Sequence, residues 1–167
     1  MAPKRSDLLN ITLEIEGEKQ LSRALGIYAK NVKDLRGVWP DLQEDFLEGE
    51  RKIFKDQRTT KGKWKRLSSP YREWKAKRFR GRGILIATGN LMGSLTKAKH
   101  PNHFFVASKK GMTIGSAVPY ASYHQTGTSK MPKREVIRLR KEQKSRWPKL
   151  IHQFIVESGQ GFIRVKL

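Results

Sequence analysis

The residues of this chain that come closest to a catalytic motif are Glu73 and Lys75, which flank Trp74. A carboxylate and a lysine at this spacing occur in nucleases, where the carboxylate holds a divalent cation near the scissile phosphate. Such a site also needs an aspartate on a preceding strand. The nearest aspartate, Asp56, falls in a segment that we predict to be helical, so the pattern does not indicate a nuclease.

The histidines are the next candidates, as metal ligands or as a base. His100 and His103 are three residues apart, but no nearby Cys, Asp or Glu completes a set of ligands. His124 lies beside Gln125 and close to Gly127, where we expect it to hydrogen-bond to a neighbouring loop rather than to act as a base. No serine or threonine lies in a nucleophile elbow, and no glycine-rich loop precedes a lysine at phosphate-binding spacing. We therefore expect no enzyme activity, no metal and no cofactor.

Composition narrows the class of protein. The 167 residues include no cysteine, so neither disulfides nor thiolate metal sites are available. No apolar run approaches the roughly 18 residues that span a bilayer, and the first residues lack the apolar core of a signal peptide. We expect neither membrane association nor export.

The formal net charge of +21 is distributed unevenly. Residues 1–57 hold 10 Lys or Arg and 11 Asp or Glu, whereas residues 58–167 hold 26 and 4. So dense a like charge repels itself, and a polyanion or an acidic protein surface would relieve that repulsion. A basic face that serves only solubility is the alternative.

Residues 58–83 form the most basic segment, in which 11 Lys or Arg are interspersed with Trp64, Tyr71, Trp74 and Phe79. Alternating cations and aromatic rings can hold phosphates and stack on bases. The same pattern is typical of an amphipathic helix whose Tyr and Trp anchor in a core while its lysines extend to solvent. Under both interpretations, we expect residues 78–83 at the end of the segment to form an exposed, mobile loop.

Hydrophobic periodicity predicts the elements that position these residues. Residues 9–15 alternate apolar and polar, as in a half-buried strand. A heptad pattern of apolar residues follows, interrupted by Gly37 and Pro40. We predict two helices, 18–36 and 40–57, with one long kinked helix as the alternative. The apolar stripe is expected to be core, and otherwise a contact between subunits.

The remaining predicted elements are shorter. They are a helix over 90–97 with Asn90 near its cap, strands 103–108 and 112–117 in a hairpin, an aromatic turn or short helix over 119–125, a helix from about Pro148 to Gly159, and a strand over 162–165.

These elements predict an α+β fold. Its small, mostly antiparallel sheet would contain the N-terminal strand, the central hairpin and a possible C-terminal strand, packed by the long N-terminal helices and the C-terminal helix. We expect a single domain over 1–167, with a flexible basic N-terminus over 1–7 and a partly mobile basic loop or short helix over 58–83.

Several short motifs follow one another in a defined order: ILIATGNLMGSL from Ile84, IGSAVPYASYHQTG from Ile114 and MPKR from Met131. Their order and spacing resemble the phage virion morphogenesis family of tail-completion proteins, over about half of the chain. The resemblance rests on Trp64, Leu67, Tyr71, Thr88, Gly89, Leu91, Ser94, Gly115, Tyr120, His124, Gln125, Gly127, Pro132 and Arg134. Because it places Trp64, Leu67 and Tyr71 in the shared fold pattern, we favour packing over base stacking for these side chains.

The resemblance implies a structural virion protein of the phage neck or tail end, a tail-completion or tail-terminator protein assembled in the host cytoplasm. Copies of the chain would close a homo-oligomeric ring, expected to be a hexamer, that caps the tail tube and joins it to the neck and head. Contacts that complete a rotation end growth, whereas open ones propagate filaments. DNA in the lumen would be within reach of the basic part of the chain.

The alternative function is a free-standing protein that binds nucleic acid without sequence specificity. Both functions would use the same basic residues to contact DNA or an acidic partner: Lys61, Lys63, Lys65, Arg66, Arg78, Arg80, Arg82, Lys130, Lys133, Arg138 and Arg140. The motif residues between them are expected to build the scaffold.

Overall fold

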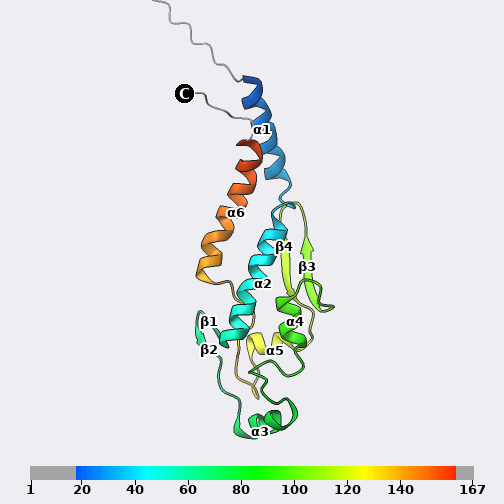
Figure 1. Cartoon of the computed structure of the whole chain (residues 1–167), viewed down its shortest axis with the longest axis vertical. Coiled ribbons are helices and arrows are strands. Elements are labelled where there is room, and N and C mark those ends of the chain that lie inside the picture. The colour runs from blue at the N-terminus through cyan, green and yellow to red at the C-terminus, as the bar shows by residue number, and fades with distance from the viewer. Residues whose placement is uncertain (1–17, 161–167) are drawn as a thin grey trace, which may run out of the picture.

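The computed structural model describes residues 18–160. The strands predicted over 9–15 and 162–165 and the flexible terminus predicted over 1–7 lie outside the described residues. Within residues 18–160 the chain forms six helices and two antiparallel two-stranded sheets, which confirms the α+β class (Figure 1). The helices are α1 (Glu18–Lys33), α2 (Trp39–Asp56), α3 (Ser69–Arg78), α4 (Asn90–Thr96), α5 (Ala121–Thr126) and α6 (Lys141–Gln160). Strand β1 (Arg58–Thr59) pairs with β2 (Gly62–Lys63), and β3 (His103–Ala107) pairs with β4 (Met112–Ser116).

The predicted division into two N-terminal helices is confirmed. Between α1 and α2, Gly37 lies so close to Phe154 of α6 that a β-carbon would come 2.6 Å from the ring. Pro40 lies in the first turn of α2, where a missing backbone N–H removes no helical hydrogen bond. The chain therefore turns at Gly37 and α2 begins with its proline already accommodated.

The apolar stripe along these helices behaves differently in its two halves. On α2 its members are buried, including Leu42, Phe46 and Ile53. On α1 the buried residue is Ala24, whereas Leu21, Leu25 and Val32 are 49%, 54% and 56% exposed. The prediction that the whole stripe is core is wrong for α1, because α1 packs along α6 through a neighbouring face. We call Leu21, Leu25 and Val32 the α1 stripe.

Helix α6 begins seven residues before the predicted start, at Lys141, so Pro148 lies inside it. A proline in a helix loses one hydrogen bond and strains the preceding turn. Contacts with Asp45 of α2 hold the turn that precedes Pro148 in place. Trp147 donates from Nε1 to Asp45 Oδ2 over 2.8 Å, and Arg146 forms an ion pair with the same carboxylate. Further along α6, Leu150, Ile151 and Phe154 pack against Val38, Trp39 and Leu42 at the start of α2.

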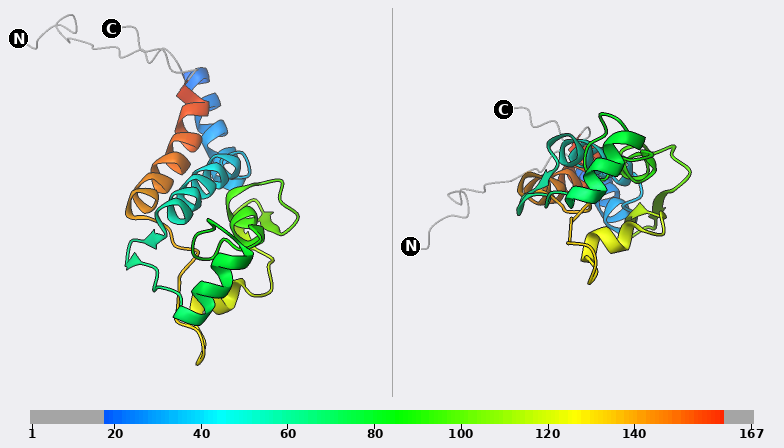
Figure 2. Two further views of the ribbon diagram at one scale, coloured as in Figure 1. Left: turned by 60° about the horizontal axis from the view of Figure 1, so that its bottom comes forward. Right: turned by 90° about the horizontal axis from the view of Figure 1, so that it is seen from below.

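The core consists of two clusters that share Trp147 at their edges. The larger joins α2 to α4 and α5 and includes Trp64, whose ring meets Phe54 edge to face with centroids 5.4 Å apart. The molecule is elongated: α1 and α6 form one end, and α3 and α5 lie at the other (Figures 1 and 2). None of the helices in residues 18–160 is both long and apolar enough to cross a membrane.

Candidate functional site

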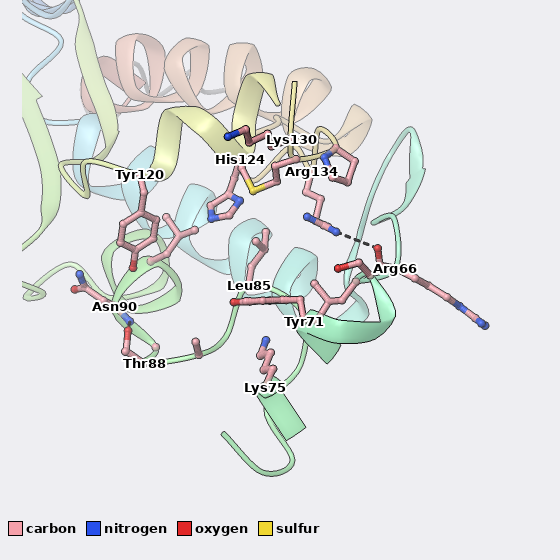
Figure 3. Close-up of a pocket in the computed structure, with 17 residues that line it drawn as sticks. Arg66, Tyr71, Lys75, Leu85, Thr88, Asn90, Tyr120, His124, Lys130 and Arg134 are labelled. Carbon is pink, nitrogen blue, oxygen red and sulfur yellow. Dashed lines mark hydrogen bonds between the residues drawn. The ribbon is translucent and has the colours of Figure 1, made fainter. Parts of the chain in front are cut away.

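A pocket of about 790 Å³ lies at the end of the molecule formed by α3 and α5 (Figure 3). Its walls come from residues 66–75, 85–91, 120–124 and 130–134, four segments that are separate in the sequence. Nine of the fourteen motif residues line it: Leu67, Tyr71, Thr88, Gly89, Leu91, Tyr120, His124, Pro132 and Arg134. The motif order seen in the sequence therefore corresponds to one place in the fold.

The other motif residues hold the walls together. Trp64 donates from Nε1 to the carbonyl of Glu135 over 2.7 Å. Ser94 Oγ lies 2.7 Å from Ser116 Oγ and donates to the carbonyl of Leu91. Gly115 is buried on β4. These hydrogen bonds account for the indole at position 64 and the hydroxyl at position 94.

Gln125 fixes the chain that follows the pocket. Its amide nitrogen donates to the carbonyl of Ile137 over 2.9 Å, and its Oε1 accepts from the backbone N–H groups of Val136 and Ile137. The side chain thus acts as a strand partner for residues 136–137. Just after it, Gly127 ends α5 with a φ of 82°, a left-handed conformation that favours glycine.

Arg134 ties the pocket floor to the basic segment. Its Nε donates to the carbonyl of Lys65 over 2.8 Å and its Nη2 to the carbonyl of Arg66 over 3.0 Å. Its backbone N–H donates to the carbonyl of His124. The side chain is only 5% exposed, and burial lowers the pKa of the guanidinium.

Helix α3 buries its lysine and exposes its aromatic rings. Lys75 is 4% exposed and donates from Nζ to the carbonyl of Gly83 over 2.5 Å. Burial, followed by the charge of Arg134, lowers the pKa of Lys75. Tyr71 and Trp74 are 46% and 49% exposed and stack on each other with centroids 5.3 Å apart. The expectation that these two rings anchor in the core is wrong, while Trp64 is in the core and Leu67 is half-buried.

The imidazole of His124 makes no hydrogen bond to a loop among residues 18–160, although the backbone carbonyl of His124 accepts from Arg134. Its Nδ1 is buried and has no partner among residues 18–160. The ring meets Tyr120 edge to face, with centroids 5.9 Å apart. Burial and the charge of Arg134 lower the pKa of His124, which keeps the imidazole neutral at neutral pH.

The predicted contact cations fall into three groups. Lys61, Lys133 and Arg138 surround the buried carboxylate of Glu135, with nitrogen–oxygen distances of 3.7, 3.0 and 2.6 Å. Arg138, above all, lowers the pKa of Glu135 to about 2. These three cations are thus partly committed within the fold, as is Arg140, which lies 3.9 Å from Glu142.

The second group is at the pocket, where Arg66 and Lys130 form part of the wall. The third group is exposed and has no ion pair with any residue of the described part of the chain: Lys63, Lys65, Arg78, Arg80 and Arg82. It extends from β2 to the turn after α3. Residues 58–63 form the β1–β2 hairpin, which the sequence did not predict.

The possible metal and nuclease residues are not brought together. His103 uses both ring nitrogens, 2.8 Å from the carbonyl of Ser94 and 3.0 Å from Gln43 Nε2. His100 Nδ1 accepts from the backbone N–H of Asn102. Glu73 is exposed on α3. Among residues 18–160 no group of three His, Cys, Asp or Glu could hold a metal ion.

Two features of the pocket were not predicted from the sequence, although both residues match the family pattern: the burial of Lys75 and the backbone conformation of Leu85. The sequence gives no signal that Lys75 is buried, because α3 carries charges all around and no periodicity indicates its buried side. Leu85 lies in the pocket wall with a φ of 63°, in the left-handed region that a branched side chain rarely adopts. Its type alone carries no signal of that conformation.

The motif residues thus tie separate backbone segments together around a cationic pocket. The sequence model of the phage virion morphogenesis family matches residues 17–154. The chain belongs to this family, and its role is in the assembly of the phage particle. No curated protein and no solved structure matches it.

Proposed function

We propose that the chain is a structural protein of the phage neck or tail end, a tail-completion or tail-terminator protein. Copies close a ring, expected to contain six subunits, that caps the tail tube and joins it to the head. The protein acts by complementary surfaces and not by catalysis. Its partners are its own copies, the proteins of the tail tube and neck, and DNA in the lumen.

The observation that carries this proposal is the α1 stripe. Leu21, Leu25 and Val32 lie on one side of a helix at the narrow end of the molecule, and each is about half exposed. Covering a large aliphatic side chain gains about 1.5–3 kcal/mol when it goes from full exposure to full burial. A helix that presents such a stripe to water is suited to contact a second subunit. Heterologous contacts of this kind form rings when the rotation closes.

The distribution of exposed positive charge supports the proposed contacts with DNA and with acidic neighbouring proteins. Lys63, Lys65, Arg78, Arg80 and Arg82 are exposed. In a ring they would attract DNA phosphates in the lumen or acidic surfaces of neighbouring proteins.

The ring is tested by placing two carboxylates in the α1 stripe, as Leu25→Glu with Val32→Glu. Wild-type protein should form a closed oligomer without DNA, measured by light scattering after size-exclusion chromatography. The double variant should be monomeric with unchanged helix content, because burying two charges against a partner is costly. Lys30→Glu is the matched control: it changes the charge by the same two units on the opposite, exposed face of α1 and should leave the oligomer intact.

A monomeric wild-type protein at high concentration would contradict the ring. That monomer could instead bind duplex DNA with an affinity that falls steeply as the salt concentration rises, with a log–log slope of about 0.9 per phosphate contact. This result would favour the free-standing nucleic-acid-binding function over the ring.

A further inference from the structure

The pocket concentrates positive charge that the described part of the chain does not neutralise. Lys75 and Arg134 are both more than nine-tenths buried, and no ion pair among residues 18–160 includes either of them. Their hydrogen bonds go to neutral carbonyl groups. Two buried cations without a counter-ion are costly, and a carboxylate placed between them would offset that cost.

Other groups around the same space still have hydrogen-bonding capacity. Arg134 Nη1 makes no hydrogen bond to residues 18–160, and His124 Nδ1 is buried without a partner. In Figure 3, His124, Arg134 and Lys75 lie around Leu85 and Tyr71; Lys75 is directed toward Tyr71, and the guanidinium of Arg134 toward the carbonyl of Arg66. No Asp or Glu lines the pocket.

The backbone at Leu85 is a second, independent sign of a binding site. A left-handed conformation at a leucine costs roughly 1–2 kcal/mol. Such strain persists where the surroundings impose it, and it clusters at ligand sites. Here the backbone N–H of the preceding residue, Ile84, donates to Gln57 Oε1 over 3.1 Å, and the pocket wall is built on that anchor.

The remaining wall is apolar. Leu67, Leu85, Leu91, Met131 and Pro132 line it, and the exposed Tyr71–Trp74 stack lies beside it. A ligand that fits must therefore carry both an acidic group and apolar side chains. Nucleic acid is less suited, because a duplex carries its phosphates on a broad outer surface and has no flexible group to reach a buried ammonium. A volume of about 790 Å³ is in the range that takes a few residues of a peptide.

We propose that the pocket binds a short acidic peptide segment of a neighbouring protein, with an Asp or Glu side chain between Lys75 and Arg134 and apolar side chains against Leu67, Leu85 and Tyr71. The assignment of this neighbour to the virion rests on the proposed function. The acidic and apolar character of the peptide is inferred independently, from the residues that line the pocket.

The probe is a fluorescein-labelled peptide, Leu-Glu-Phe-Glu-Leu with a capped C-terminus, followed by fluorescence anisotropy. The full-length protein should bind it, and the peptide with Gln in place of both Glu should bind at least about tenfold more weakly, because the charge-assisted contacts are lost. Lys75→Met keeps the aliphatic volume and removes the charge, and it should weaken binding by a similar factor. Lys77→Met removes one charge from the exposed side of the same helix and should change the affinity less than about twofold.

Tyr71→Glu provides a second variant in case Lys75→Met unfolds. Tyr71 is exposed, so the fold should tolerate the change, and a carboxylate at the wall should repel the acidic peptide. Equal binding of the Glu and Gln peptides, or no effect of either pocket variant, would overturn the proposal. Displacement of the peptide by a 20-base-pair duplex, with Lys75→Met weakening the duplex equally, would also overturn it in favour of phosphate binding. Performing the titrations in the Leu25→Glu, Val32→Glu background separates this result from ring formation.

Discussion

At the scale of single residues, Glu50 is unusual because its carboxyl group is buried, whereas most glutamates lie at the surface. It lies on the buried side of α2, 1% exposed, and its Oε2 has no hydrogen-bond partner within residues 18–160. Burial raises the pKa of this carboxyl well above the ordinary value of 4.5, and the backbone N–H of Arg138 only partly opposes the change. The folded protein therefore keeps this carboxyl protonated up to a higher pH than the unfolded chain does.

Glu50→Gln should stabilise the protein at neutral pH by about 1–3 kcal/mol, the usual cost of burying an unpaired polar group. A raised pKa gives stability that is fully present below pH 4.5 and is lost as the pH rises through the pKa of the folded state. The gain from the substitution should therefore be absent at pH 4 and grow as the pH rises. Urea unfolding at several pH values measures it.

Glu48→Gln is the control for this experiment. Glu48 is exposed, and its hydrogen bond to Lys52 lowers its pKa. A lowered pKa contributes stability above the unfolded pKa that is lost as the pH falls, so this substitution should change stability in the opposite direction. A Glu50→Gln variant with the same stability as wild type at pH 7 would show that Glu50 is solvated or paired.

Residue-level prediction from the sequence is easiest where the residue type restricts its role. Trp64, Gln125 and Gly127 are each used in a way that suits an indole, an amide and a glycine. It failed for Glu50 and Lys75, because charged residues are mostly exposed and only tertiary contacts show which of them are buried.

At the scale of elements, Gly26 within α1 and Gly127 directly after α5 show how position decides the effect of one substitution. Gly127 has a positive φ, and an added β-carbon would lie 2.9 Å from the backbone nitrogen of Lys133. Gly26 lies within α1, and an added β-carbon would meet nothing within 4 Å. Gly127→Ala should destabilise the protein by about 2 kcal/mol or more, and Gly26→Ala should stabilise it by about 0.5–1 kcal/mol. Thermal unfolding of both variants checks the signs, and a stable Gly127→Ala variant would contradict the assigned turn.

The elements themselves were predicted unevenly. The bounds of α2, α4, β3 and β4 agree with the sequence pattern to within a residue, since a cap, a turn or a strong periodicity marks each end. The start of α6 and the orientation of α1 were wrong. Periodicity shows that a helix has an apolar face, but it does not show which neighbour covers that face or whether packing outweighs an internal proline.

At the scale of the whole molecule, two surfaces lie at opposite ends of an elongated chain. The α1 stripe is near one end, and the cationic pocket between α3 and α5 is at the other (Figure 2). Their chemistry differs, since one is apolar and the other combines positive charge with apolar walls. We propose that the subunit contacts its own copies through one end and a different protein through the other.

We propose that the chain occupies the neck or tail end of the phage particle as a ring. Cryo-electron microscopy of purified virions, with localised reconstruction of the neck and both tail ends, tests it most directly. We expect a closed ring at the head-proximal end of the tail, with six copies into which residues 18–160 fit. Particles whose neck and tail ends contain no density that accepts this fold would contradict it.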